Sequence, residues 1–156
     1  MSGEALRTAI ATGGCQCGAV RYALFAAPSK TAICHCRMCQ KAAGAPFGVF
    51  AVVDAKDFAW TRGKPLSWQS SNRVARDFCG ACGTPLACRP LDKPVMELMT
   101  GSLDEPQKAP PTYAVGRESK LEWVDHIGKL PSQTTLENMG PDRLATIVNY
   151  QHPDHD

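Results

Sequence analysis

The sequence lacks three features that mark particular classes of protein. No window approaches the ~18 consecutive apolar residues of a membrane-spanning helix, and the longest apolar-rich stretch, Phe47–Val53, has the length of a strand. No internal repeat or low-complexity run occurs, and the balance of 44% hydrophobic to 21% charged residues excludes a disordered chain. The 17 Lys and Arg residues exceed the 15 Asp and Glu residues by two, too few to build a phosphate-neutralising surface. We therefore expect neither a membrane nor a nucleic-acid partner.

The N-terminal segment also lacks the pattern of a targeting signal. It reads MSGEALRTAIATGG, without an apolar h-region, and Glu4 stands where a signal peptide is basic. We expect a cytoplasmic protein whose cysteines stay reduced. The 156 residues suffice for one domain with its own core. We place that domain at residues 13–150, between an N-terminal lead-in (1–12) and a C-terminal tail (151–156).

Short stretches of alternating or continuously apolar character, separated by turn residues, predict a mostly β domain. The expected strands lie at 18–25, 47–53, 58–61, 66–69, 74–78, 85–89 and 95–100. Helix is expected at a single turn, Lys41–Gly44, and near the C-terminus from Pro141 onward. There Leu144, Ile147 and Val148 recur at helical spacing.

Cysteine is the residue present in excess. The eight cysteines among 156 residues, roughly 5%, exceed what most intracellular enzymes carry but fall below the roughly 8–10% of a disulfide scaffold. They form three local clusters and one isolated residue: Cys15-Gln16-Cys17, Cys34-His35-Cys36-Arg37-Met38-Cys39, Cys79-Gly80-Ala81-Cys82 and Cys88. In a chain without a secretory signal, such clusters favour metal binding over disulfides.

The spacing Cys79-x-x-Cys82 is that of a zinc knuckle, which presents two sulfurs to one ion. A closed tetrahedral site needs four sulfurs at ~2.3 Å, and Cys15 with Cys17 is the natural second pair. The alternative for Cys79 and Cys82 is a thioredoxin-type redox pair. That reading calls for a flanking βαβ pattern, which the sequence does not show.

The spacing Cys34-x-Cys36-x-x-Cys39 places three thiols within six residues. Three local ligands can hold a metal and leave the fourth position open, as in catalytic zinc sites. Cys88 could close this site as a fourth ligand, or could be a small buried hydrophobic residue. His35 could replace a cysteine or shuttle protons, but a position between two ligands predicts a side chain that points away from the metal.

In this order, the motifs resemble one known family. They are Gly13-Gly14-Cys15-Gln16-Cys17-Gly18-Ala19-Val20-Arg21-Tyr22, Cys34-His35-Cys36-Arg37-Met38-Cys39-Gln40-Lys41, Arg62-Gly63, Trp68-Gln69-Ser70-Ser71, Arg76-Asp77-Phe78-Cys79-Gly80-Ala81-Cys82-Gly83-Thr84-Pro85-Leu86, and Trp123-Val124-Asp125-His126-Ile127 with Leu130-Pro131. This pattern resembles the glutathione-dependent formaldehyde-activating (GFA) family, which shares its domain with centromere protein V. The resemblance spans residues 13–131.

The resemblance implies a β-tent-type zinc-binding domain with antiparallel sheets and few short helices. By motif, it implies a structural zinc and a second, catalytic zinc on two groups of cysteines: Cys15, Cys17, Cys79 and Cys82, and Cys34, Cys36 and Cys39. The implied activity is that of a carbon–sulfur lyase, joining formaldehyde to the co-substrate glutathione as S-hydroxymethylglutathione. The alternatives are a family enzyme on another small substrate and a non-catalytic, zinc-stabilised protein-binding module.

The chemistry of a three-thiolate site agrees with a thiol substrate. Zn²⁺ held by three thiolates carries one net negative charge, so it suits a further soft ligand better than it activates water. Glutathione would bring two carboxylates, and its candidate anchors near the motifs are Arg21, Arg37, Arg73 and Arg76. His126, Ser70 and Ser71 are candidate pocket residues. Trp60, Trp68 and Trp123 could form the floor of a small-molecule cleft, but in a small β domain they are expected in the core.

Overall fold

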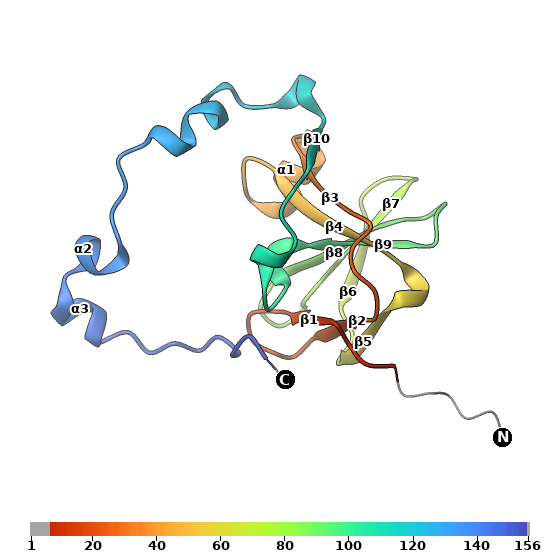
Figure 1. Ribbon diagram of the computed structural model, residues 1–156, viewed down its shortest axis with the longest axis horizontal. Coiled ribbons are helices and arrows are strands. Elements are labelled where there is room, and N and C mark those ends of the chain that lie inside the picture. The colour runs from red at the N-terminus through yellow and green to blue at the C-terminus, as the bar shows by residue number, and fades with distance from the viewer. Residues whose placement is uncertain (1–6, 156) are drawn as a thin grey trace.

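The computed structural model describes residues 7–155 and contains two β-sheets (Figure 1). The smaller sheet has three strands in the order β1-β2-β5, and the larger has seven in the order β10-β3-β4-β9-β8-β7-β6. The strands are β1 (Ala11–Gly14), β2 (Arg21–Leu24), β3 (Lys30–Cys34), β4 (Gly48–Asp54), β5 (Phe58–Arg62), β6 (Leu66–Gln69), β7 (Val74–Phe78), β8 (Pro85–Pro90), β9 (Val95–Met99) and β10 (Tyr113–Val115). The prediction of a mostly β domain is confirmed.

Seven of these strands, β2 and β4 to β9, lie where the sequence predicts them. Three strands, β1, β3 and β10, were missed. Strand β1 has the sequence Ala-Thr-Gly-Gly, without apolar alternation, and it begins inside the expected lead-in, of which residues 1–6 lie outside the described part of the chain. Strand β10 has only three residues. It pairs with β3 in parallel, whereas the other strand pairs of the two sheets are antiparallel. The sheets are therefore not wholly antiparallel, because β10 reaches its partner by a long crossover rather than a hairpin.

The main core lies between the two sheets. Tyr22 and Leu24 enter it from β2, and Leu86 and Leu98 enter it from the larger sheet. All four side chains are fully buried. Burying one such side chain contributes about 1.5–3 kcal/mol, so this layer is the principal source of stability. Trp60 is partly buried and packs edge-on against Tyr22 at a centroid distance of 5.9 Å, so it lies at the margin of the predicted core.

A buried ion pair joins the small sheet to the segment after β9. The guanidinium of Arg21 donates to both carboxylate oxygens of Asp104, at 2.8 and 2.6 Å, and the two side chains are 2% and 6% exposed. Thr12 donates a further hydrogen bond to the same carboxylate. Because removing either partner would strand a buried charge, this pair fixes the crossover to the core.

The opposite face of the larger sheet carries a second, smaller apolar cluster of Cys39, Phe50 and Cys88. Helix α1 (Arg37–Ala43) covers this face. The helix is longer than the single predicted turn, because the Cys36 side chain already caps its N-terminus by accepting from the backbone N–H of Cys39. Gly44 ends the helix in the left-handed conformation, with φ of 60°.

After β10 the chain leaves the sheets and forms an extended arm, residues 120–150, before it returns to β1 (Figure 1). The arm carries α2 (Thr135–Met139) and α3 (Pro141–Ala145); 3-10 helices occur at Ala55–Asp57, Thr100–Ser102, Pro106–Lys108, Arg117–Ser119 and Glu122–Lys129. Helix α3 starts where predicted but ends before Ile147 and Val148, which are 52% and 66% exposed. No helix within residues 7–155 has the length and apolar character needed to cross a membrane.

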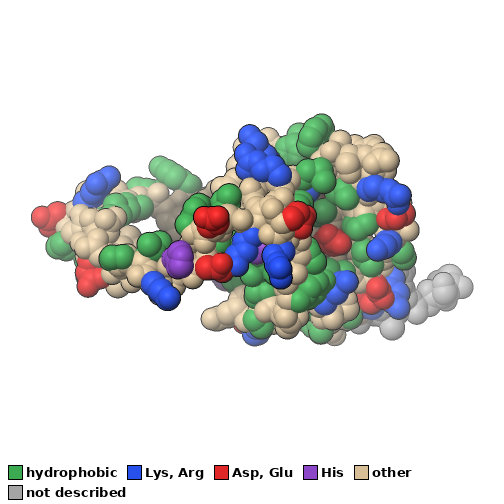
Figure 2. Space-filling view, turned by 90° about the horizontal axis from the view of Figure 1, so that it is seen from above, with side chains coloured by type: hydrophobic (Ala, Val, Ile, Leu, Met, Phe, Trp, Pro, Cys, Tyr) green, Lys and Arg blue, Asp and Glu red, His purple; other side chains and the backbone are tan. Residues whose placement is uncertain are grey.

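The arm exposes apolar side chains along its length, visible as green atoms on the lobe beside the body in Figure 2. These side chains are Trp123, Ile127, Leu130, Leu136, Ile147, Val148 and Tyr150. Beyond the arm, the backbone N–H of His152 donates to the carbonyl of Gln16 at 2.8 Å. The expected tail, 151–156, is thus attached to the β1–β2 turn as far as the structure describes it.

Candidate metal centres and an adjoining pocket

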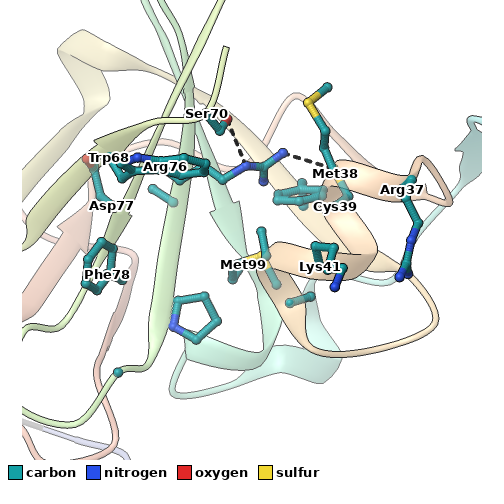
Figure 3. A pocket seen from close by; sticks show the side chains of 16 residues that line it. Arg37, Met38, Cys39, Lys41, Trp68, Ser70, Arg76, Asp77, Phe78 and Met99 are labelled. Atoms are coloured by element: carbon teal, nitrogen blue, oxygen red, sulfur yellow. Dashed lines mark hydrogen bonds between the residues drawn. The ribbon is translucent and has the colours of Figure 1, made fainter.

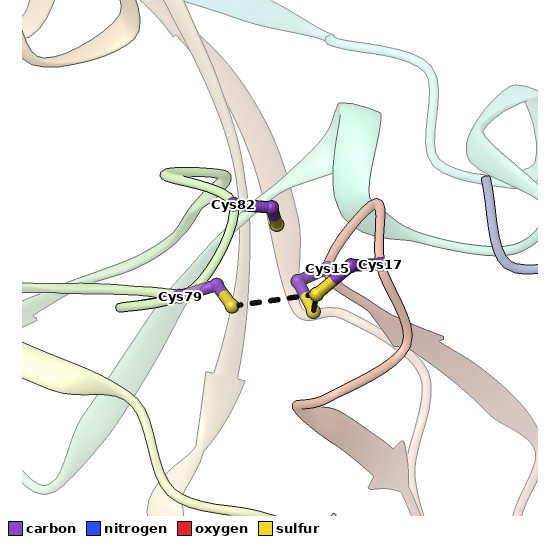
Figure 4. A group of neighbouring side chains, drawn as sticks. All are labelled: Cys15, Cys17, Cys79 and Cys82. Carbon is purple, nitrogen blue, oxygen red and sulfur yellow. Dashed lines mark hydrogen bonds between the residues drawn. The ribbon is translucent and has the colours of Figure 1, made fainter. Parts of the chain in front are cut away.

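The first cysteine cluster joins the two sheets (Figure 4). Cys15 and Cys17 lie in the β1–β2 turn, and Cys79 and Cys82 lie in the β7–β8 turn. All four Sγ atoms lie within 4.8 Å of one another; the Sγ atoms of Cys15 and Cys17 are 3.6 Å apart, and those of Cys17 and Cys79 are 3.8 Å apart. The structure therefore brings together the two pairs that the spacing suggested.

Both turns are folded around their sulfurs. The backbone N–H of Val20 donates to Cys15 Sγ at 3.2 Å, and the hydroxyl of Thr84 lies 3.1 Å from Cys82 Sγ. Burial alone would raise the pKa of Cys82, but hydrogen bonds from the side chain and backbone of Thr84 lower it to about 6. For Cys17 the backbone N–H of Ala19 lowers the pKa, yet the neighbouring thiols Cys15 and Cys82 raise it to about 12.

Four thiolates as close together as these sulfurs would repel one another. A divalent cation among them removes that penalty. The donor set is wholly sulfur, with no histidine or carboxylate within the group. Four thiolates suit zinc in a closed tetrahedral site, so the residues present fit the expected metal.

The second cluster is local in sequence. Cys34 ends β3, Cys36 caps α1, and Cys39 lies in the first turn of that helix, with the three Sγ atoms within 4.8 Å of one another. Strand β10 supports this segment: the carbonyl of Val115 accepts from the backbone N–H of His35 at 3.0 Å. Three soft donors on a short segment also fit zinc, with fewer protein ligands than a closed site requires.

The two proposed additional ligands of this cluster do not join it. Among the described residues, neither His35 nor Cys88 belongs to the group of ligand atoms around Cys34, Cys36 and Cys39. The His35 ring is buried and meets Phe47 edge-on at 5.5 Å, in agreement with a side chain directed away from the sulfurs. Cys88 is 5% exposed on β8, and burial raises the pKa of its thiol to about 12.

A cavity of about 460 Å³ adjoins the second cluster, between α1 and strands β6, β7 and β8 (Figure 3). Its walls are mainly apolar, with Met38, Phe50, Trp68, Phe78 and Met99 among the lining residues. Cys39 lines it too, together with three cationic side chains, those of Arg37, Lys41 and Arg76. The cavity thus combines a soft-metal ligand, an apolar wall and positive charge.

Arg76 connects the cavity to the cluster. Its Nη2 donates to Cys39 Sγ at 3.5 Å, and its Nε donates to the hydroxyl of Ser70 at 3.2 Å. Burial raises the pKa of the Cys39 thiol and outweighs the hydrogen bond from Arg76, which lowers it. For Cys36, burial raises the pKa, but backbone N–H groups at the start of α1 lower it below its ordinary value.

Most of the other residues predicted as site candidates lie away from the cavity. Arg21 is used in the core by Asp104, and Arg73 lies at the surface in an ion pair with Asp92. His126 is exposed on the arm, and Ser71 accepts from the backbone N–H of Arg73 within a turn. The expectation of a core position is wrong for two tryptophans: Trp68 and Trp123 are 64% and 54% exposed. Trp68 lies on the edge strand β6 and lines the cavity, in agreement with the cleft alternative.

The cavity-lining residues that sequence reasoning missed include Met38, Lys41 and Met99. Met38 and Lys41 stand three residues apart, the spacing at which side chains share a helix face, but the helical turn expected from sequence began only at Lys41. Met99 carried no local signal, because its place opposite Phe50 depends on the pairing of β9 with β4.

Fold and site together define a β domain with two cysteine clusters able to hold metal ions, one of them beside a pocket. Residues 10–118 match the protein family described as "Glutathione-dependent formaldehyde-activating enzyme". The chain belongs to this GFA family, which confirms the resemblance seen in the motifs; the Trp123–Ile127 block lies beyond the matched residues.

Among solved structures, the fold is similar to that of a Rhodobacter sphaeroides protein known from a crystal structure. The TM-score is 0.54 at 20% sequence identity, and the match covers 67% of this chain and 99% of that one. At this identity the likeness concerns the fold alone.

Proposed function

We propose that the protein is a zinc-dependent carbon–sulfur lyase-type enzyme that forms or cleaves a thiol–aldehyde adduct. The reaction we assign is the interconversion of glutathione and formaldehyde with S-hydroxymethylglutathione. Family membership supports the reaction class. The observation that carries the proposal is the position of Cys39, which belongs to the three-sulfur cluster and also lines the cavity.

The two clusters have different parts in this proposal. Cys15, Cys17, Cys79 and Cys82 would hold a structural zinc between the sheets, and Cys34, Cys36 and Cys39 would hold the second zinc at the cavity. When bound there, zinc would supply a soft cationic site that favours the thiolate over the thiol form of a substrate.

The remaining work falls to the chain's own side chains. The apolar walls around Trp68, Phe50 and Met99 would exclude water from the reacting atoms. Arg37 and Lys41, both exposed at the cavity, would attract the carboxylates of a thiol such as glutathione. In the reaction the thiolate sulfur bonds to the aldehyde carbon, the carbonyl π pair moves to oxygen, and that oxygen takes up a proton equivalent to the one the thiol released.

Metal analysis combined with exchange NMR tests this proposal. The purified protein should contain two zinc ions per chain and should accelerate exchange between formaldehyde hydrate and S-hydroxymethylglutathione over the same mixture without protein. Two ions without acceleration would mean a family enzyme that acts on another substrate. In either case we propose a cytoplasmic location, where the eight cysteines stay reduced.

A non-catalytic protein-binding module is the second candidate, and the exposed apolar side chains of the arm favour it. Contiguous exposed apolar surface is typical of interaction sites. Such a module needs only the closed four-sulfur site. One zinc per chain, with no effect on adduct exchange, would therefore favour this candidate over the enzyme.

A further inference from the structure

We propose that Arg76 is a catalytic residue that donates hydrogen bonds to the aldehyde oxygen as the carbon–sulfur bond forms. This inference rests on the proposed function and adds to it the group that receives the developing negative charge. It is carried by the placement and the pairing of the Arg76 side chain.

Strand register places Arg76 on the face that forms the cavity. On β7 it lies opposite Trp68 of β6 and opposite Cys88 of β8, and directly paired residues project to the same side of a sheet. Figure 3 shows the side chain extended across the cavity toward Cys39. Its guanidinium is held by the two hydrogen bonds, from Nε to Ser70 and from Nη2 to Cys39 Sγ.

Arg76 differs in its partners from three other arginines near the two sheets. Arg21, Arg73 and Arg89 each pair with a carboxylate, of Asp104, Asp92 and Asp77 respectively. Within residues 7–155 no carboxylate lies in ion-pair distance of Arg76, and its hydrogen-bond acceptors are a hydroxyl and a cysteine sulfur. The bonds to Ser70 and Cys39 use Nε and one N–H of Nη2, so other N–H groups of the guanidinium's five can receive an anionic partner from the cavity.

The position of the guanidinium favours the aldehyde oxygen, rather than a glutathione carboxylate, as that anionic partner. A guanidinium offers five N–H groups in one rigid plane, and the two bonds to Ser70 and Cys39 fix that plane at the edge of the sulfur cluster. The remaining N–H groups therefore lie beside the place where a thiol would meet an aldehyde. Arg37 and Lys41, which have no such contact with the cluster sulfurs among the described residues, are better placed for the distal carboxylates.

The charge change during the reaction gives this arrangement its effect. As the thiolate sulfur bonds to carbon, the carbonyl π pair becomes a full negative charge on oxygen, which water then protonates. In the reverse direction the hydroxyl loses its proton to water, the carbon–sulfur bond breaks, and the π bond forms again. Arg76 keeps its own protons throughout and stabilises the alkoxide with donors that are already oriented.

The first test compares Arg76→Met and Arg76→Lys with wild type in the exchange assay, with zinc content measured in every sample. Arg73→Met is the matched control, because Arg73 lies outside the cavity at the surface. We expect the turnover rate of Arg76→Met to fall about 100-fold, the size typical of a lost oxyanion donor, with a smaller loss for Arg76→Lys. The loss should be the same with glutathione and with 2-mercaptoethanol, which has no carboxylate, and added guanidinium should restore part of it.

Three results would overturn the assignment. A loss confined to glutathione, and seen as a raised KM, would make Arg76 a carboxylate anchor. A loss of the second zinc from both Arg76 variants would make it a structural support of the cluster. Normal turnover in Arg76→Met would exclude any role in the reaction.

A binding measurement keeps this inference separate from the proposed function. Thioacetate carries a sulfur and an oxygen on one carbon, as the adduct does, whereas ethanethiol carries only the sulfur. By calorimetry on the zinc-loaded protein, Arg76→Met should weaken thioacetate about 100-fold and ethanethiol less than threefold, following the value of one lost charged donor. Equal losses of affinity for the two probes would refute the role of Arg76, even if wild type proved inactive toward formaldehyde. A larger loss for thioacetate than for ethanethiol would support it.

Discussion

Replacing Cys79 with serine should unfold the protein, whereas replacing Cys36 with serine should leave it folded. Cys79 is 1% exposed and belongs to the main core, and its Sγ lies 3.8 Å from that of Cys17, 62 residues earlier in the chain. An ion held by the first cluster therefore cross-links turns from two different sheets. We expect this cross-link to be a condition of folding.

The magnitude follows from comparing two free energies. Binding of structural zinc is worth about 10–16 kcal/mol in small zinc domains, whereas the whole unfolding free energy of a domain is about 5–15 kcal/mol. Losing most of the zinc-binding free energy would therefore cancel the whole unfolding free energy of the domain. Cys79→Ser should therefore show no cooperative thermal transition.

The second cluster predicts a small effect. Its three sulfurs come from six consecutive residues, so a metal there closes only a short loop and constrains the unfolded chain little. Serine at position 36 can still cap α1 by accepting from the N–H of Cys39, as the sulfur does at 3.4 Å. Even complete loss of the cap would cost about 1 kcal/mol, so Tm should fall by no more than about 2–4 °C.

Circular dichroism melts and zinc analysis on the purified variants measure both effects. Cys88→Ser is the control for placing a hydroxyl in the core, since Cys88 is 5% exposed and lies outside both clusters; it should cost about 1–3 kcal/mol and leave the zinc content unchanged. Equal loss of folded structure in Cys36→Ser and Cys79→Ser would refute the division between a structural and a functional cluster. So would a Cys79→Ser protein that melts like wild type.

Two further predictions concern the scaffold that holds the clusters. Asp104→Asn should lower the unfolding free energy by about 3–5 kcal/mol at neutral pH, because it strands the charge of buried Arg21. Burial raises the pKa of Asp104, but the hydrogen bonds from Arg21 and Thr12 hold it below its ordinary value. The stabilisation from this carboxylate is therefore complete above the unfolded-state pKa of about 3.9 and is lost as pH falls through the folded-state pKa. Urea melts of wild type and variant should accordingly converge in acid. Gly63→Ala should lower Tm, because φ is +60° and a Cβ would lie 2.1 Å from the Ala19 carbonyl oxygen; Gly101→Ala, whose Cβ would meet nothing within 4 Å, is the control and should leave Tm unchanged.

The composition of the second cluster could be predicted from sequence because its geometry is local. Cys34, Cys36 and Cys39 fall at the end of a strand and the start of a helix, so their spacing alone brings the sulfurs together. The first cluster required a different argument, that a two-sulfur knuckle needs a second pair. That argument selected Cys15 and Cys17 across a long separation, and the structure places them beside Cys79 and Cys82.

The cavity could not be predicted in the same way, because it depends on strand register. Trp68 lies on the same face as Arg76 only because β6 pairs with β7 in a particular alignment, and a shift of one residue in that pairing would turn Trp68 to the opposite face. Arg76 could be named from sequence as a basic residue near the motifs, while its contact with Cys39 required the structure. The short strands β1 and β10 were missed because pairing, rather than an apolar pattern, defines them.

The central claim is that the three-cysteine cluster beside the cavity carries the activity. The most direct test measures, by exchange NMR, the rate of formaldehyde transfer to and from glutathione with wild type and with Cys36→Ser, at equal concentrations of folded protein and known zinc content. The account predicts acceleration by wild type with two zinc ions and the uncatalysed rate for Cys36→Ser with one. Equal acceleration by the one-zinc variant would contradict it, as would an uncatalysed rate for wild type with both sites filled.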